Sequence, residues 1–205
     1  MSYQIVMNSA GVIETQPIDP NEEFVWGDRN LSNKKIIDYW IWAFSDLVGN
    51  TDRGNLAEYL VAMAVGSESP VRNSWAAYDV KAPSGTRIEV KSAAYSQAWY
   101  QEKPSNIQFN IRETLEWIPE SNTFGDDRKR HSDVYVFCLL AEKDKTQLNP
   151  MDISQWEFYV IPTYILDKDF GNKQSISLKR VREYSDPIKI EELSERVRLV
   201  ISPSG

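Results

Sequence analysis

The chain has few of the side chains from which most metal and redox sites are built. Its 205 residues include one cysteine, Cys138, and one histidine, His131. Zinc sites of the structural kind and zinc hydrolases need several thiolate or imidazole ligands, so both are excluded, and a lone cysteine cannot form an internal disulfide. If metal chemistry takes place in this protein, carboxylates must hold the ion.

Long apolar runs and an excess of positive charge are also missing. No run approaches the length that crosses a bilayer, and the N-terminal residues lack the basic start and apolar stretch of a signal peptide, so we expect a cytoplasmic protein. A net charge of −7 argues against a protein that coats nucleic acid through bulk electrostatics. It does not exclude a nuclease, because an acidic protein can keep a local basic groove.

Two basic clusters could line such a groove. The alternative, which we favour slightly for each cluster, is a solvated surface. The first consists of Arg128, Lys129 and Arg130 with His131, and the second of Lys179, Arg180 and Arg182.

The composition otherwise predicts one globular domain. Hydrophobic residues make up 41% of the chain, and seven of its residues are tryptophan, which is enough for a sizeable core. Proline and glycine punctuate residues 1–32, which we interpret as an N-terminal arm. We expect the core of the domain in residues 33–161 and a C-terminal elaboration in residues 162–205.

Two helices are predicted before the central stretch. Apolar residues recur at three- and four-residue spacing from Asn33 to Val48, which predicts an amphipathic helix with its aromatic stripe in the core. A second helix is predicted from Arg53 to Val65, ended by Gly66. Its main apolar stripe consists of Leu56, Leu60 and Met63.

The second helix carries an unusual carboxylate. Glu58 projects away from the main stripe, yet its helical neighbours on that side include Val61 and Val65. It can be an ordinary surface charge, or it can point into a functional site. We favour the functional site, because helix, loop and hairpin follow one another closely enough to pack together.

Later segments supply the rest of a sheet. Residues 107–111 alternate apolar and polar side chains, as a strand with one buried face does. Residues 134–140 are apolar on both faces, which is typical of a central strand, and residues 156–161 form another strand. A last amphipathic helix is predicted over residues 191–200.

The central stretch of the chain runs from Asp79 to Lys91 and has the pattern of a β-hairpin. Two short β-like runs flank Pro83, Ser84 and Gly85, and the glycine can supply the positive φ that closes such a turn. The turn sets the register by pairing the residues on either side of it, 82 and 86.

This register places charged residues together. Asp79 lies opposite Glu89, and alternation along the strand puts Lys91 on the same face. Two carboxylates about 5 Å apart repel each other by about 3 kcal/mol at an effective dielectric near 20. A divalent cation is the obvious compensation, and hard oxygen ligands suit Mg²⁺ or Mn²⁺.

The order of elements and the spacing Asp…Glu-x-Lys resemble the PD-(D/E)xK nuclease superfamily, which has the restriction-endonuclease-like fold. The motifs match over residues 58–99, and the order of elements extends the match to residue 161. Tyr78 stands where the motif has its proline. The resemblance implies an α/β (α+β) fold with a three-layer core, in which helices flank a central mixed sheet of four to five strands.

The resemblance also implies a catalytic site. Asp79 and Glu89 would hold Mg²⁺ with the backbone carbonyl of Val90, and Lys91 would orient the attacking water and stabilise the charge on the phosphate. Glu58 would complete the outer shell of the metal or bind a second ion. Mn²⁺ is expected to substitute for Mg²⁺.

Further polar residues are candidates for substrate contacts. These are Ser92, Ser96, Gln97, Arg128, Lys129 and Arg130. DNA is favoured over RNA as the substrate, and the sequence leaves open whether two copies pair as a homodimer to cut both strands. A catalytically silent nuclease-fold module that binds nucleic acid or a protein partner is the alternative to an active DNA endonuclease.

Overall fold

The computed structural model describes residues 5–201, with the side chains of residues 31 and 32 outside the description. The first four residues of the predicted N-terminal arm and the last four of the predicted C-terminal elaboration therefore lie outside it. Within the described chain no helix combines the length and the apolar character needed to cross a membrane.

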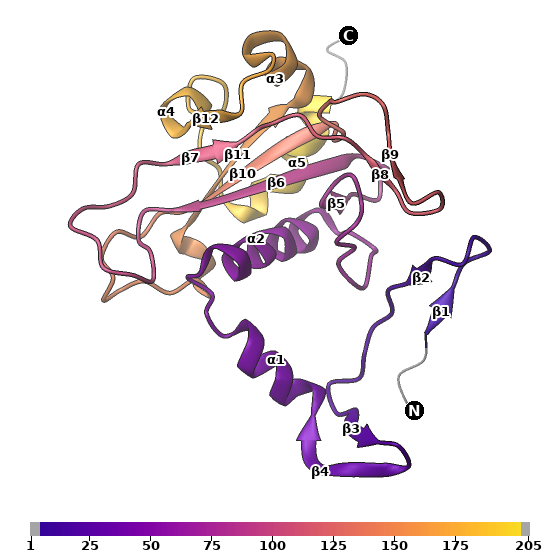
Figure 1. Cartoon of the computed structure of the whole chain (residues 1–205). Helices are drawn as coiled ribbons and strands as arrows, with labels where there is room; N and C mark the ends of the chain where they lie inside the picture. Colours follow the sequence, from indigo (N-terminus) through magenta and orange to yellow (C-terminus); the bar gives the residue numbers. More distant parts are fainter. Residues whose placement is uncertain (1–4, 202–205) are drawn as a thin grey trace.

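A four-stranded mixed sheet forms the centre of the body (Figure 1). Its strands are, in spatial order, β11 (Trp156–Pro162), β10 (Val134–Leu140), β6 (Arg87–Ala94) and β5 (Val80–Lys81). β10 runs parallel to β6 and antiparallel to β11, and β5 runs antiparallel to β6. Every residue of β10 is buried, as predicted for a strand that is apolar on both faces.

Helices cover one face of this sheet. α2 (Asn50–Val65) packs on β6, α5 (Ile190–Ile201) packs on β11, and the two helices contact each other. The first hydrophobic core lies between them and the sheet. It includes Leu60 and Val61 of α2, Val90 of β6 and Leu193 of α5.

The other face of the sheet carries a second core beneath α3 (Thr163–Phe170), α4 (Leu178–Val181) and a small sheet of β7 (Gln108–Asn110) and β12 (Ser175–Ser177). Phe109, Phe137 and Leu166 meet in this core. The fold is thus mixed α+β with a layer on each side of a central mixed sheet, as predicted, and its described part contains five α-helices. A 3-10 turn, Ile153–Gln155, precedes β11.

Two short hairpins lie beside the edge of the sheet that ends in β5. One pairs β1 (Val6–Met7) with β2 (Ile13–Glu14), and the other pairs β8 (Trp117–Ile118) with β9 (Thr123–Phe124). Both consist of strands two residues long.

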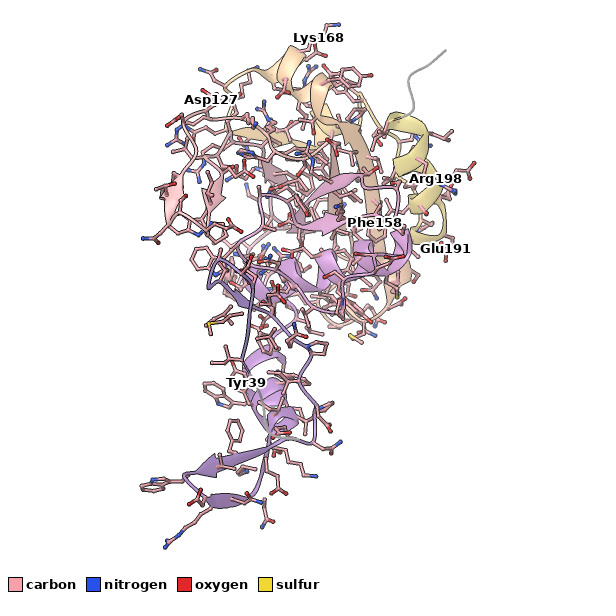
Figure 2. The ribbon with its side chains drawn as sticks, turned by 90° about the vertical axis from the view of Figure 1, so that its right-hand side faces the viewer. Tyr39, Asp127, Phe158, Lys168, Glu191 and Arg198 are labelled. Carbon is pink, nitrogen blue, oxygen red and sulfur yellow. The ribbon has the colours of Figure 1, made fainter. Side chains whose placement is uncertain are left out.

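The remaining elements project from the body as a stalk (Figure 2). We define the stalk as residues 23–44, which comprise the hairpin of β3 (Glu23–Trp26) and β4 (Arg29–Lys35) followed by α1 (Ile36–Phe44). The helix predicted here does form, but none of its residues is buried. Its predicted place in the core was therefore wrong.

The buried side of α2 also differs from the predicted stripe. Met63 is exposed, whereas Ala57, Leu60, Val61 and Val65 are buried against the sheet. The helix ends at Gly66, whose φ of 69° lets its N–H reach the carbonyls of Ala62 and Met63.

Candidate active site

The hairpin of β5 and β6 has the predicted register. Val80 pairs with Ile88, and the N–H of Ala82 donates to the carbonyl of Thr86 at 2.9 Å. Gly85 adopts a φ of 88° and donates its N–H to Ala82 at 2.8 Å, which closes the turn. A residue with a Cβ rarely adopts this φ, so glycine is required here.

Asp79 turns inward where the β5 ladder ends. Its N–H donates to the carbonyl of Ile88 at 3.1 Å, although Ile88 is already paired with Val80. Two residues of one strand thus oppose one residue of the other, as in a β-bulge. Asp79 therefore does not pair directly with Glu89, contrary to the prediction. The Asp79 carboxylate bends over β6 and accepts the backbone N–H of Val90 at 2.8 Å.

Glu89 and Lys91 share the face of β6 that points away from α2. Ile88 and Val90 fill the first core on one face, so alternation leaves the two charged residues half-buried on the other. The Lys91 ammonium donates to Glu89 Oε1 at 2.5 Å, and the Ser132 hydroxyl donates to Glu89 Oε2 at 3.2 Å. Both oxygens of Glu89 are therefore held in place.

Burial and like charge act together on Asp79. Burial, and then the negative charge of Glu89, raise the pKa of Asp79 to about 7, while the Lys91 ammonium and the Val90 N–H oppose the rise. The ionised carboxylate of Asp79 is therefore destabilising in the absence of a cation. Carboxylates with pKa values perturbed in this way are common at functional sites.

Asp79 and Glu89 line one pocket of about 220 Å³. Aromatic and polar side chains complete its wall, among them Trp75, Tyr78, Thr114, Trp117, His131 and Tyr135. Burial, and then Glu89, raise the pKa of Tyr135, so its hydroxyl stays protonated and can donate a hydrogen bond at neutral pH.

Glu58 reaches Asp79 from the opposite side. Its side chain is only 14% exposed, so it is no ordinary surface charge, and Arg72 pairs with both of its oxygens at 2.5 and 2.9 Å. Glu58 and Asp79 line a second pocket that Glu89 does not line. The charge of Glu58 also raises the pKa of Asp79.

The donor set suits a hard divalent cation held by few protein ligands. In residues 5–201 no group of three or more His, Cys, Asp or Glu side chains is arranged to hold a metal, and Arg72 occupies the oxygens of Glu58. Mg²⁺ needs no such cage, because it is usually bound through one or two carboxylates and keeps several waters. Asp79 and Glu89, with the carbonyl of Val90, the residue that follows Glu89, fit that requirement.

Three predicted substrate contacts belong to a network inside the protein. Ser96 and Gln97 are buried and Ser92 is half-buried. The buried guanidinium of Arg53 bonds to Ser92 at 3.1 Å and Gln97 at 3.4 Å, and Ser96 donates to the carbonyls of Glu142 and Lys143. Ser96 and Gln97 are thus buried in internal contacts and do not face substrate as predicted, whereas the predicted substrate contact of half-buried Ser92 stays a prediction.

The basic cluster at 128–130 is divided by the fold. Arg128 and Lys129 are exposed, but the Arg130 side chain has no exposed surface. Its guanidinium pairs with Asp167 at 2.7 Å and donates to the carbonyls of Ile111 and Gly171 at 2.8 and 2.7 Å. Arg130 is committed to internal contacts and cannot bind substrate, contrary to the prediction.

Two residues of the site were not predicted, Ser132 and Tyr135. Both belong to the segment that leads into and begins β10, where Tyr135 is the parallel neighbour of Glu89. The alternation of β10 could have placed Tyr135 on a sheet face, but its pairing with β6 cannot be deduced from local sequence.

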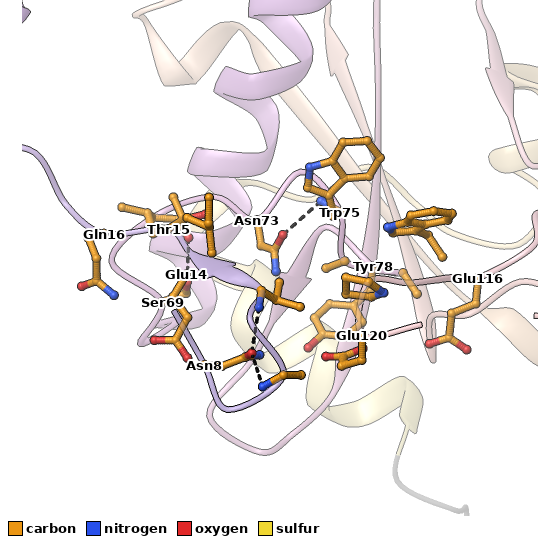
Figure 3. Close-up of a pocket in the computed structure, with 18 of the residues that line it drawn as sticks. Asn8, Glu14, Thr15, Gln16, Ser69, Asn73, Trp75, Tyr78, Glu116 and Glu120 are labelled. Carbon is orange, nitrogen blue, oxygen red and sulfur yellow. Dashed lines mark hydrogen bonds between the residues drawn. The ribbon is translucent and has the colours of Figure 1, made fainter. Parts of the chain in front are cut away.

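A larger cleft of about 1020 Å³ adjoins the pocket (Figure 3). It lies between the β1–β2 hairpin and residues 69–78, and Trp75, Tyr78 and Trp117 line both spaces. Its charged lining residues are Glu14, Arg87, Glu116 and Glu120. Arg87 pairs with Asp133 at 2.6 Å, so the described part of this cleft is not the basic groove that a duplex-binding protein would present.

Comparison with known protein families shows which family the chain belongs to. The family model of bacteriophage T4 endonuclease IV matches residues 43–180. The chain belongs to this family. The matched region contains Glu58, Asp79, Glu89 and Lys91, whereas almost the whole stalk precedes it. The family is one of nucleases, so the site described above lies in a nuclease domain.

Other comparisons add little. A solved structure of a bacterial homing endonuclease is similar, with 17% sequence identity and a TM-score of 0.39 over 72% of this chain and 90% of that chain. No curated protein matches the chain.

Proposed function

We propose that the protein is a Mg²⁺-dependent endonuclease of the PD-(D/E)xK type that hydrolyses phosphodiester bonds, with DNA as its substrate. One observation carries the proposal. Asp79 and Glu89 line a single pocket, and the Lys91 ammonium lies 2.5 Å from Glu89, within the region matched by a nuclease family.

Asp79, Glu89 and the carbonyl of Val90 would hold the ion. When bound, Mg²⁺ supplies Lewis-acid polarisation of the phosphate and lowers the pKa of a coordinated water. The positive charge of the ion would offset both the cost of burying the Asp79 carboxylate and its repulsion by Glu89. Glu58, already paired with Arg72, contributes negative potential from the outer shell.

Lys91 is the proposed catalytic cation. Its side chain is 28% exposed, so it keeps access to solvent while it remains beside Glu89. An ammonium there can hydrogen-bond the attacking water and stabilise the negative charge that develops on the phosphate. Ser132 positions the Glu89 carboxylate, and through it the Lys91 ammonium, by its hydrogen bond to Glu89.

Cleavage assays test the proposal. Purified protein is incubated with plasmid DNA, and with RNA of matched sequence, in Mg²⁺, Mn²⁺ or EDTA. We expect DNA cleavage that requires the divalent ion. Lys91→Ala should lower the rate by about 100-fold or more, the usual effect of removing a transition-state charge donor.

Lys168→Ala is the control, because Lys168 is an exposed lysine on α3 that lines neither pocket of the site. It should cut at close to the wild-type rate. Melting curves must show that both variants are folded. Unchanged cleavage by Lys91→Ala would remove Lys91 from the mechanism. A folded wild type that cuts nothing with either ion would favour a silent nuclease-fold module.

A further inference from the structure

The stalk exposes an apolar surface that folded proteins normally bury. Eight of its large apolar side chains are exposed, and Trp26 and Trp42 are 78% and 83% accessible. The other six are Phe24, Val25, Ile37, Tyr39, Ile41 and Phe44. In Figure 2 the labelled Tyr39 lies on the stalk, well away from Phe158 in the body.

α1 has no solvent face of the usual kind. Its sequence, IIDYWIWAF, contains one charged residue, Asp38, and that carboxylate caps the helix by accepting the N–H of Lys35 at 2.8 Å. A helix that is apolar around its whole circumference is normally surrounded by protein. Within the described chain α1 has contacts with β4 but buries none of its residues.

We propose that a second copy of this chain covers the stalk, so that two stalks pack together in a symmetric homodimer. The exposed apolar side chains offer on the order of 800 Å² per copy, given that each buried aromatic contributes roughly 150–250 Å². Two such surfaces make a total of about 1,600 Å², the usual size of a stable specific interface. The eight side chains belong to one hairpin and the helix that follows it, and their summed exposed area is larger than the apolar patches that monomers commonly expose.

The charges of the stalk favour a copy of itself over an oppositely charged partner. Residues 23–44 contain three acidic residues (Glu23, Asp28, Asp38) and three basic residues (Arg29, Lys34, Lys35), so their net charge is zero. The whole chain carries −7. Two neutral stalks can therefore meet without the repulsion that two acidic bodies would experience, and nothing in the stalk is basic enough to prefer nucleic acid.

The backbone offers the same self-complementarity. In the described chain β3 pairs with β4 alone, which leaves an outer edge free on each strand. Unpaired edges recruit further strands. Pairing of the same edge across a twofold axis would satisfy both copies at once, which is the requirement of an isologous dimer.

Sedimentation of the full chain tests the proposal. Wild type should show a dimer of the 23.6 kDa chain whose population rises with concentration. The double variant Ile41→Glu, Trp42→Glu should sediment as a monomer with an unchanged circular dichroism spectrum. Tyr164→Glu, which alters an exposed aromatic residue on α3 of the body, should remain dimeric.

A mixing experiment distinguishes stalk-to-stalk packing from packing of a stalk on the other copy's body. Tagged wild type should capture untagged wild type but not the untagged double variant, because a symmetric interface needs two intact stalks. Capture of the variant would overturn the proposal. A wild type that is monomeric at every concentration, or a double variant that still dimerises, would also overturn it. None of these outcomes depends on catalysis.

Discussion

The Asp79 carboxylate accepts a hydrogen bond from the backbone N–H of Val90, the residue between Glu89 and Lys91 in the chain. This bond brings the first acid of the motif onto the strand that carries the other two charged groups. The irregular end of the β5 ladder lets Asp79 reach this position. The geometry of the site thus depends on a backbone contact as well as on side chains.

The raised pKa of Asp79 predicts a pH-dependent stability in the absence of metal. Folded Asp79 titrates near pH 7, above the ordinary value of 3.8, so the native state holds the proton more tightly than the unfolded state does. Its contribution to stability is present below about pH 4 and is lost as the pH rises towards 7. Asp79→Asn should therefore unfold at a higher temperature than wild type at pH 8.

A difference of one pKa unit between the folded and unfolded states is worth about 1.4 kcal/mol, so we expect a gain on the order of 4 kcal/mol at pH 8. The gain should vanish below pH 4, and denaturation in EDTA measures it. Asp127→Asn is the control, because this exposed carboxylate should have little effect at either pH. Equal stability of wild type and Asp79→Asn at both pH values would show that Asp79 is not an unfavourable charge.

Divalent ions should stabilise the wild type through Asp79 and Glu89. Binding to the native state adds about 2.7 kcal/mol when the ion is at 100 times its Kd. Because a ligand carboxylate must lose its proton, the effect should be larger at pH 8 than at pH 6. Thermal melts with Mg²⁺, Mn²⁺ and EDTA measure it. Asp79→Asn should respond much less, and an equal response would place the ion elsewhere.

Ser132→Ala should weaken the site without unfolding the protein. The buried hydroxyl fixes one oxygen of Glu89, and loss of such a supporting bond commonly lowers metal affinity or activity by about tenfold or more. The concentration of Mg²⁺ that gives half-maximal cleavage should rise. Ser132→Thr keeps the hydroxyl and should restore most of the affinity, whereas a purely structural role would change the melting temperature and leave the Mg²⁺ dependence alone.

Arg130→Met should destabilise the fold itself. The substitution removes the partner of Asp167 and leaves the carbonyls of Ile111 and Gly171 without their donor. Asp167 is 53% exposed and can be rehydrated, so the cost comes mainly from the carbonyl of buried Ile111 left without its donor, about 1–3 kcal/mol. Denaturant titration should show this loss, and Arg128→Met, at an exposed position, should show almost none. A stable Arg130→Met that has lost only DNA binding would restore Arg130 to the substrate surface.

Local chemistry made the hairpin predictable from the sequence. Its turn is short, Gly85 adopts the positive φ that the sequence suggested, and alternation then determines which face Glu89 occupies. The partners of β6 were less accessible, because parallel pairing with β10 joins residues more than forty positions apart. Ser132 therefore could not be connected to Glu89 in advance.

Two errors have a common physical origin. The periodicity of residues 33–48 correctly predicts a helix with an apolar surface, but periodicity does not specify what covers that surface. The sequence shows that residues 128–130 are basic, but it does not show which of them reach the surface. The tertiary fold surrounds Arg130 with backbone carbonyls and Asp167. The residue type determines the chemistry of a side chain, but its burial and its contacts depend on segments that are distant in the sequence.

Because β6 lies between β5 and β10, the strand that carries Glu89 and Lys91 should be more rigid than the hairpins that line the cleft. Strand β6 is held by hydrogen-bonded neighbours on both sides, whereas the β1–β2 and β8–β9 hairpins beside the cleft are isolated ladders of two residues each. Amide hydrogens of β6 should exchange only when the whole body opens, and those of the hairpins should exchange through local fluctuations. The proposed catalytic groups would then remain fixed while the hairpins that line the cleft open and close.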